Sequence, residues 1–140
     1  MKFVRSYREL AVYVKARALA RDLFELSKRL PGEEKFALTD QLRRSSRSVG
    51  AQIAEAWGKR KYERHFVSKL TDADSEQLET QHWIDTAFDC AYVSEDLQGE
   101  YIERLEEIGR MLQGMMDKAD LFCTANPARL AEDTAQYFTN

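Results

Sequence analysis

Proline and glycine are scarce in this chain, and their scarcity favours helices. The only prolines are Pro31 and Pro127, so none interrupts the long stretch between them. Six glycines occur, whereas Ala, Leu, Glu, Arg and Gln are plentiful, a composition typical of helical proteins. A chain of 140 residues is long enough to bury the core of one domain.

Long apolar runs are also missing. No stretch approaches the ~20 apolar residues that a membrane-spanning helix needs. Charged residues recur every few positions near the first residue, where a signal peptide would have an apolar segment. We therefore expect a cytoplasmic protein without a membrane partner.

Cysteine and histidine occur only twice each. Cys90 and Cys123 are too few for a disulfide framework and lack metal-ligand spacing, so we expect two buried thiols in a reducing compartment. His65 and His82 would lie roughly 25 Å apart on one helix, too far to share a metal ion. Glu79 and His82 have a metal-like spacing, but a di-iron bundle requires a second such pair. We expect no metal site and no cofactor.

Motifs of enzymatic chemistry are missing as well. The serines at 45, 46 and 48 lack the glycines of a nucleophile elbow, and no glycine-rich phosphate-binding loop occurs. Neither cysteine has a neighbouring base that would activate it. We therefore expect a protein that is not an enzyme.

Charge is divided unevenly along the chain. Residues 1–70 contain 17 Lys and Arg against 8 Asp and Glu, a net charge of +9. Residues 71–140 contain 4 against 16, a net charge of −12. The basic half is suited to phosphate groups, but the two halves are equally suited to neutralising each other within a bundle or between subunits.

Apolar residues recur at three- and four-residue steps in four segments, which predicts four helices. Their connections are short, so we predict an all-α, up-down-up-down antiparallel four-helix bundle over residues 1–123. Residues 124–140 are expected to form a partly ordered C-terminal tail. The predicted helices span about residues 5–30, 36–57, 62–92 and 95–122.

Each predicted helix has an apolar stripe that would face the core. In the first helix the stripe includes Val14 and Ala18, and in the third it includes Leu78. Gln77 and Gln81 interrupt the third stripe, which indicates either a polar layer or a subunit interface. In the fourth helix the apolar residues follow a regular heptad. They are Tyr101, Leu105, Ile108, Leu112, Met115, Ala119 and Phe122.

Basic residues concentrate on the second predicted helix and the turn that follows it. Arg17 and Arg21 lie one turn apart on the first helix, and Trp57 and Tyr62 are available to stack on bases. Alternatively, Arg43 and Arg47 pair with carboxylates of the bundle itself. The predicted nucleic-acid-binding residues are Arg43, Arg44, Arg47, Lys59, Arg60, Lys61 and Arg64.

Small residues form another edge of the second helix, which would let a neighbouring helix approach closely. This edge is either the tight side of the bundle or a subunit contact, to which Trp57, Phe66 and the Gln77–Gln81 layer would contribute. The small residues are Ser45, Ser46, Ser48, Gly50, Ala51 and Ala54.

The chain resembles the four-helix-bundle proteins encoded within intervening sequences of bacterial 23S rRNA genes. The motif is Leu30-Pro31-x-Glu33-Glu34-x-Phe36-x-Leu38-x-x-Gln41-Leu42-Arg43-Arg44-Ser45-x-x-Ser48-Val49, followed by Ile53-Ala54-Glu55 and Phe66. The resemblance implies a homopentamer. Distant relatives are basic accessory proteins of diversity-generating retroelements, which contact nucleic acid and reverse transcriptase. No catalytic residues carry over.

Together these features predict a non-enzymatic, self-associating helical bundle, with a pentamer favoured. Its basic face would bind RNA or DNA with little sequence specificity. The alternative is a protein-interaction scaffold whose basic and acidic halves pair between subunits, with no role for nucleic acid.

Overall fold

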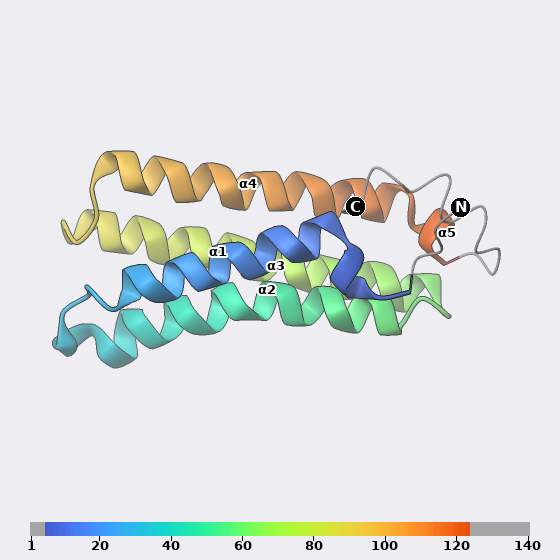
Figure 1. The fold of residues 1–140 in the computed structure, drawn as a ribbon, viewed down its shortest axis with the longest axis horizontal. Helices are drawn as coiled ribbons and strands as arrows, with labels where there is room; N and C mark the ends of the chain where they lie inside the picture. Colours follow the sequence, from blue (N-terminus) through green and yellow to red (C-terminus); the bar gives the residue numbers. More distant parts are fainter. Residues whose placement is uncertain (1–4, 124–140) are drawn as a thin grey trace.

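The protein is a bundle of four long helices, which confirms the predicted fold class. The structure is a computed structural model and describes residues 5–123. Successive helices run in opposite directions along one long axis (Figure 1). They are α1 (Ala11–Ser27), α2 (Asp40–Gly58), α3 (Glu63–Asp89) and α4 (Glu95–Asp117).

Short helical turns flank the long helices and correct two predicted boundaries. Residue Leu10 is extended (ψ 127°), so the first helix begins only at Ala11 and a separate turn precedes it. Lys118, with φ −117° and ψ 32°, interrupts the fourth predicted helix before Phe122. The short elements are η1 (Tyr7–Glu9), η2 (Gly32–Glu34), the π-helical turn η3 (Lys35–Thr39) and α5 (Ala119–Phe122).

Helix α3 ends earlier than predicted because Ala91 adopts a left-handed conformation with φ 62°. The Tyr92 amide donates to the Ala87 carbonyl at 2.9 Å, which closes the helix end in the manner of a Schellman motif. The Tyr92 hydroxyl then donates to Glu34 at 3.0 Å, joining the two loops at this end of the bundle. That hydrogen bond raises the pKa of Tyr92 to about 12.

The core follows the predicted stripes on α2 and α4, and follows most of the predicted stripes on α1 and α3. All seven residues of the predicted heptad from Tyr101 to Phe122 are buried. Val14 and Leu78, predicted to face the core, are exposed. In α1 the extended Leu10 shifts the helical phase at the start of the helix, so Val12 and Ala16 face inward in place of Val14 and Ala18, whereas Leu19, Leu23 and Leu26 are buried as predicted. The buried apolar residues of α1 are Val12, Ala16, Leu19, Leu23 and Leu26.

A polar layer crosses the core between α3 and α4. Gln77 is only 4% exposed, donates to Asp74 at 2.9 Å and accepts from Gln81 at 2.8 Å. Gly109 lies opposite, where a Cβ atom would come within 2.8 Å of the Gln77 amide nitrogen. Gln77 therefore belongs to a polar layer inside the bundle.

Several residues expected elsewhere belong to this core. Trp57 and Phe66, suggested as subunit contacts, are buried within the chain. Cys90, expected to be buried, is exposed next to the turn at Ala91, and Cys123 is partly buried. Burial raises the pKa of the Cys123 thiol to about 11.

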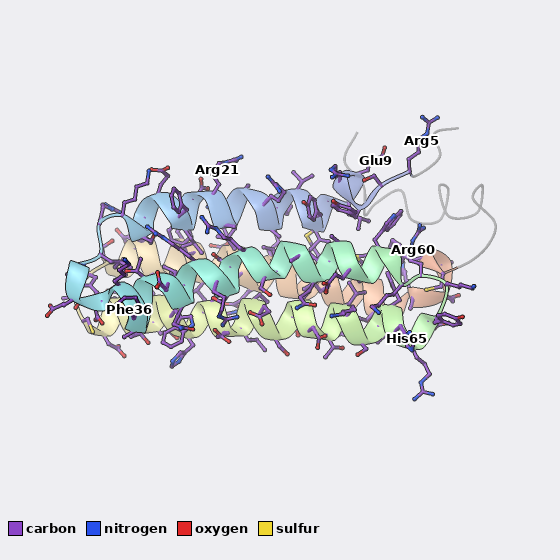
Figure 2. The ribbon with its side chains drawn as sticks, turned by 90° about the horizontal axis from the view of Figure 1, so that it is seen from below. Arg5, Glu9, Arg21, Phe36, Arg60 and His65 are labelled. Atoms are coloured by element: carbon purple, nitrogen blue, oxygen red, sulfur yellow. The ribbon has the colours of Figure 1, made fainter. Side chains whose placement is uncertain are left out.

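Helix α1 is held unevenly by its neighbours. It contacts α2 extensively and α4 much less, whereas α2 and α3 share the largest contact in the bundle. Figure 2 looks onto α2, with α1 along one side and α3 along the other. No helix among residues 5–123 is long and apolar enough to cross a membrane.

We expect Gly109→Ala to lower the free energy of unfolding by about 1 kcal/mol, because displacing Gln77 from its hydrogen bonds costs more than the new alanine gains in helix propensity. Gly99→Ala on the same helix is the control, since nothing lies within 4 Å of its added methyl group. It should raise stability by about 0.5–1 kcal/mol through helix propensity. Urea denaturation measures both. Equal stabilisation of the two variants would contradict the close contact at Gly109.

Candidate nucleic-acid interface

The seven predicted basic residues do not form one patch, and the structure divides them into three groups. Adjacent residues of a helix point about 100° apart, so Arg43 and Arg44 face different neighbours. Arg43 and Arg47 face α1, Arg44 faces α3, and the others lie at the turn between α2 and α3.

The first group is held against α1 without a carboxylate. The guanidinium groups of Arg43 and Arg47 lie 4.7 Å and 5.1 Å from the ring centre of Phe24. Arg43 also donates to the hydroxyl of Ser27 at 2.7 Å. Within residues 5–123, neither arginine makes an ion pair, so their positive charge is not neutralised by the bundle in the way the alternative interpretation required.

The second group is Arg44, whose charge is already matched. It pairs with Glu76 at 3.3 Å and with Glu79, both on α3. Glu79 also accepts a hydrogen bond from the indole of Trp83 at 3.0 Å, and this bond, together with Arg44, lowers the pKa of the Glu79 carboxyl. Arg44 therefore joins α2 to α3 rather than presenting a free charge, and Glu79 has partners other than a metal ion.

The third group lies at the end of the bundle opposite the loop from α1 to α2. Figure 2 shows Arg60 at this end, near His65, and far from Phe36. Arg60 covers the face of Trp57 at 3.5 Å and donates to its carbonyl, so Trp57 is not available to stack on a base. Burial lowers the pKa of Arg60. The exposed members of the group are Lys59, Lys61 and Arg64, accompanied by the exposed ring of Tyr62.

A groove of about 570 Å³ lies between α1 and α2, on the side of Arg47. Small residues of both helices line it. The small-residue edge predicted on the second helix therefore lines this groove in addition to packing inside the bundle. Its larger lining residues are aromatic or cationic, and none of its lining residues is acidic. They are Tyr7, Tyr13, Ala16, Arg17, Ala20, Arg21, Phe24, Ser46, Arg47, Gly50, Ala51 and Ala54.

Sequence reasoning included Arg17 and Arg21 but missed Tyr13 and Phe24. Tyr13, Arg17 and Arg21 follow one another at four-residue steps, which places them along one strip of a helix. That spacing was readable from the sequence, whereas the contact of Phe24 with two arginines of α2 depends on how α1 packs. Arrays of arginines and aromatic rings bind phosphates and flat rings.

We expect the coupling between Arg44 and Glu79 to depend on pH. Because the folded-state pKa of Glu79 is lowered, its contribution to stability is present above about pH 4.3 and is lost as the pH falls through that folded-state pKa. A double-mutant cycle with Arg44→Gln and Glu79→Gln should give a coupling of about 0.5–1 kcal/mol at neutral pH, since the pair is half-exposed. Urea denaturation at a series of pH values below about 4.3 should show the coupling declining as the pH falls and Glu79 becomes protonated. An unchanged coupling in acid would refute the charge pairing.

Two comparisons with known proteins bear on the identity of the chain. The sequence model described as "23S rRNA-intervening sequence protein" matches residues 8–114. The chain is also similar to a crystal structure of a protein of unknown function from the S23 ribosomal protein family of Bacteroides thetaiotaomicron. The two share 28% identity with a TM-score of 0.69, over 76% of this chain and 95% of the other. No curated protein matches the chain significantly.

The family match covers most of the bundle, from just before α1 to near the end of α4, and includes the whole of α2 and α3. It confirms the resemblance seen in the motif around Arg43 and Arg44. The chain therefore belongs to the 23S rRNA-intervening sequence protein family.

Proposed function

We propose that this protein is a self-associating, non-enzymatic bundle that binds RNA or DNA through the face formed by α1 and α2. The observation that carries the proposal is that Arg43 and Arg47 lie beside an acid-free groove and have no carboxylate partner within residues 5–123. Unneutralised arginines attract a polyanion from a distance and exchange its counterions on contact.

The proposed contact surface includes two arginines that were not among the seven predicted binding residues, and it gives Arg44 a smaller role. Arg43 and Arg47 are joined by Arg17 and Arg21 of the groove. Lys59, Lys61 and Arg64 form a second basic cluster at the far end of α2, where Lys59 lies roughly 18 Å from Arg47 by helical rise. Arg44 contributes little because Glu76 and Glu79 already bind it. The two basic regions would contact the phosphate backbone of one strand at two places, with little base specificity.

A salt titration with a structured RNA tests nucleic-acid binding. We expect a Kd on the order of micromolar near physiological salt, with log affinity falling linearly against log salt concentration. Arg43→Glu with Arg47→Glu should weaken binding at least tenfold, since two attractive charges become repulsive.

The matched control is Arg44→Gln, which removes a charge that α3 already neutralises and should change affinity less than threefold. Circular dichroism establishes that each variant is folded. Affinity no better than about millimolar at low salt, or indifference to the Arg43 and Arg47 changes, would end the proposal.

Self-association has its own observation on α3. Leu78 is 55% exposed on a strip that also carries the exposed residues Ser75, His82 and Asp85. An exposed leucine suits an apolar contact with a second copy. If the acidic surface of α3 instead met the basic α1–α2 face of that copy, the face would be occupied, as in the alternative of a scaffold whose basic and acidic halves pair between subunits.

Light scattering tests self-association and the nature of the contact. We expect a mass near five times the 16.3 kDa of the chain, and a lower mass for Leu78→Gln. Loss of mass as salt rises would indicate a contact made by charge, whereas an apolar contact should persist. A single-chain mass at every salt concentration would refute self-association.

A further inference from the structure

We infer that the groove between α1 and α2 is a site for single-stranded nucleic acid, in which an unpaired base stacks on Tyr13 while phosphates contact Arg17, Arg21 and Arg47. This inference rests on the proposed nucleic-acid binding and adds the class of strand and the residue that would recognise it. The phosphates of duplex RNA or DNA would contact the arginines, but its paired bases would not stack on the Tyr13 ring.

The first support is the shape of the groove. Its volume of about 570 Å³ lies within the range of about 300–1,000 Å³ that accommodates ligands with rings. Small residues of both helices line it, including Ala16, Ala20 and Gly50. Gly50 lies beside the ring of Tyr13, and a Cβ atom there would be 3.7 Å from the Cε1 atom of that ring.

The second support is the way in which the Tyr13 ring is fixed. Tyr7 packs against it edge-to-face, with the ring centres 4.8 Å apart and the planes at 76°. Arg17 donates to its hydroxyl at 3.3 Å from one turn further along α1. A ring held at its edge and at its hydroxyl is ordered before a ligand arrives, so little side-chain entropy is lost on stacking.

The third support is the arrangement of charge. Arg17 and Arg21 line the groove from α1 and Arg47 lines it from α2, and Figure 2 shows Arg21 at the outer edge of α1, on the side away from α2. The rise from Tyr13 to Arg21 is about 12 Å. Bases of a stacked strand rise by about 3.4 Å each, and the backbone phosphates lie about twice as far apart, so about two phosphates would pass this row of cations.

Phe24 has a different role from Tyr13. Arg43 and Arg47 both lie over its ring, so that ring is already occupied and acts to hold the two guanidinium groups at the edge of the groove. Tyr13 has one arginine near it, Arg17, at a longer 5.9 Å from the ring centre. The base would therefore stack on Tyr13.

A second hollow continues the site along the outer side of α1. It has a volume of about 640 Å³ and shares Tyr13, Arg17 and Arg21 with the groove. It adds Arg8 and the exposed side chain of Val14, and its lining is also free of acids. A strand entering the groove would thus find a basic, partly apolar path on either side of Tyr13.

The ring distinguishes this site from a purely electrostatic one. In a duplex the bases are stacked on one another, so a protein ring gains no stacking without breaking the helix. In a single strand every base has a free face, and stacking on an aromatic residue tolerates any sequence.

The test compares a single-stranded RNA of about 12 nucleotides with a duplex of the same length, using the full chain. A 2-aminopurine base in the single strand should lose fluorescence on binding, as expected for stacking. We expect the single strand to bind at least tenfold more tightly than the duplex. Tyr13→Leu should weaken single-strand binding about 5- to 100-fold, whereas Tyr13→Phe keeps the ring and should stay within about threefold.

Matched controls separate the groove from general charge. Arg17→Gln with Arg21→Gln should reduce the salt slope for the single strand by about 1.4 and should not disturb folding, since both residues are exposed. Lys59→Gln with Lys61→Gln removes the same charge at the far end of α2. It should weaken binding of single strand and duplex alike, and so leave the preference for single strands and the 2-aminopurine signal at saturating protein unchanged. Tyr62→Leu removes an exposed ring outside the groove and should likewise leave the 2-aminopurine signal at saturating protein unchanged.

The outcomes distinguish this inference from the proposed function. Equal binding of single strand and duplex, or no effect of Tyr13→Leu while Arg43→Glu with Arg47→Glu abolishes binding, overturns the inference and leaves the proposed function standing. If neither RNA binds, both fail. If Tyr13→Leu or the Arg17 and Arg21 changes lower the mass in light scattering without affecting RNA affinity, the groove binds a second copy and the inference is wrong.

Discussion

The contact between α2 and α3 sets the rotation of α2 about its axis, and the rest of the structure depends on that rotation. Leu42, Val49 and Ile53 are buried along the inner side of α2, and Ser45 meets the Thr80 hydroxyl at 2.9 Å in the core. With this side fixed inward, Arg44 reaches the carboxylates of α3. The arginine at the preceding position is then turned toward α1, about 100° away. One apolar stripe therefore decides which charges are neutralised and which are not.

Positive and negative charges are also separated across the width of the bundle. Helices α1 and α2 are adjacent and come from the basic half of the sequence, whereas most of α3 and all of α4 come from the acidic half. Most ion pairs within residues 5–123 join helices of the two halves, and the side chains in them are mostly half-exposed. Exposed pairs of this kind contribute little stability, so the separation of charge is a property of the surface more than of the fold.

The sequence predicted the number, order and type of the helices because regular spacing is a local property. The heptad from Tyr101 to Phe122 was confirmed residue by residue. The stripe of α1 was wrong at Val14, because a single extended residue, Leu10, resets the phase and leaves no mark in composition. Leu78 was wrong because Gln77, beside it, is the residue that faces inward.

The candidate site was predictable in kind but not in arrangement. Seven basic residues were identifiable from charge alone, yet their division among three places depends on partners distant in the sequence. The partner of Arg44 is Glu76, and the partner of Arg60 is the ring of Trp57, which had been expected to contact nucleic acid. Whether a basic side chain has a partner within the bundle depends on which residues of other helices lie next to it. Spacing along one helix does not reveal those residues.

The weak contact of α1 with α4 links the site to local unfolding of the chain. An element held mainly from one side is expected to open at a lower free energy than the helices at the centre of the bundle. Because α1 forms one wall of the groove, a ligand that bridges α1 and α2 would bind only when this wall is in place. Occupancy of the groove and ordering of α1 would then be thermodynamically linked, so that amide hydrogen exchange in α1 becomes a measure of ligand binding.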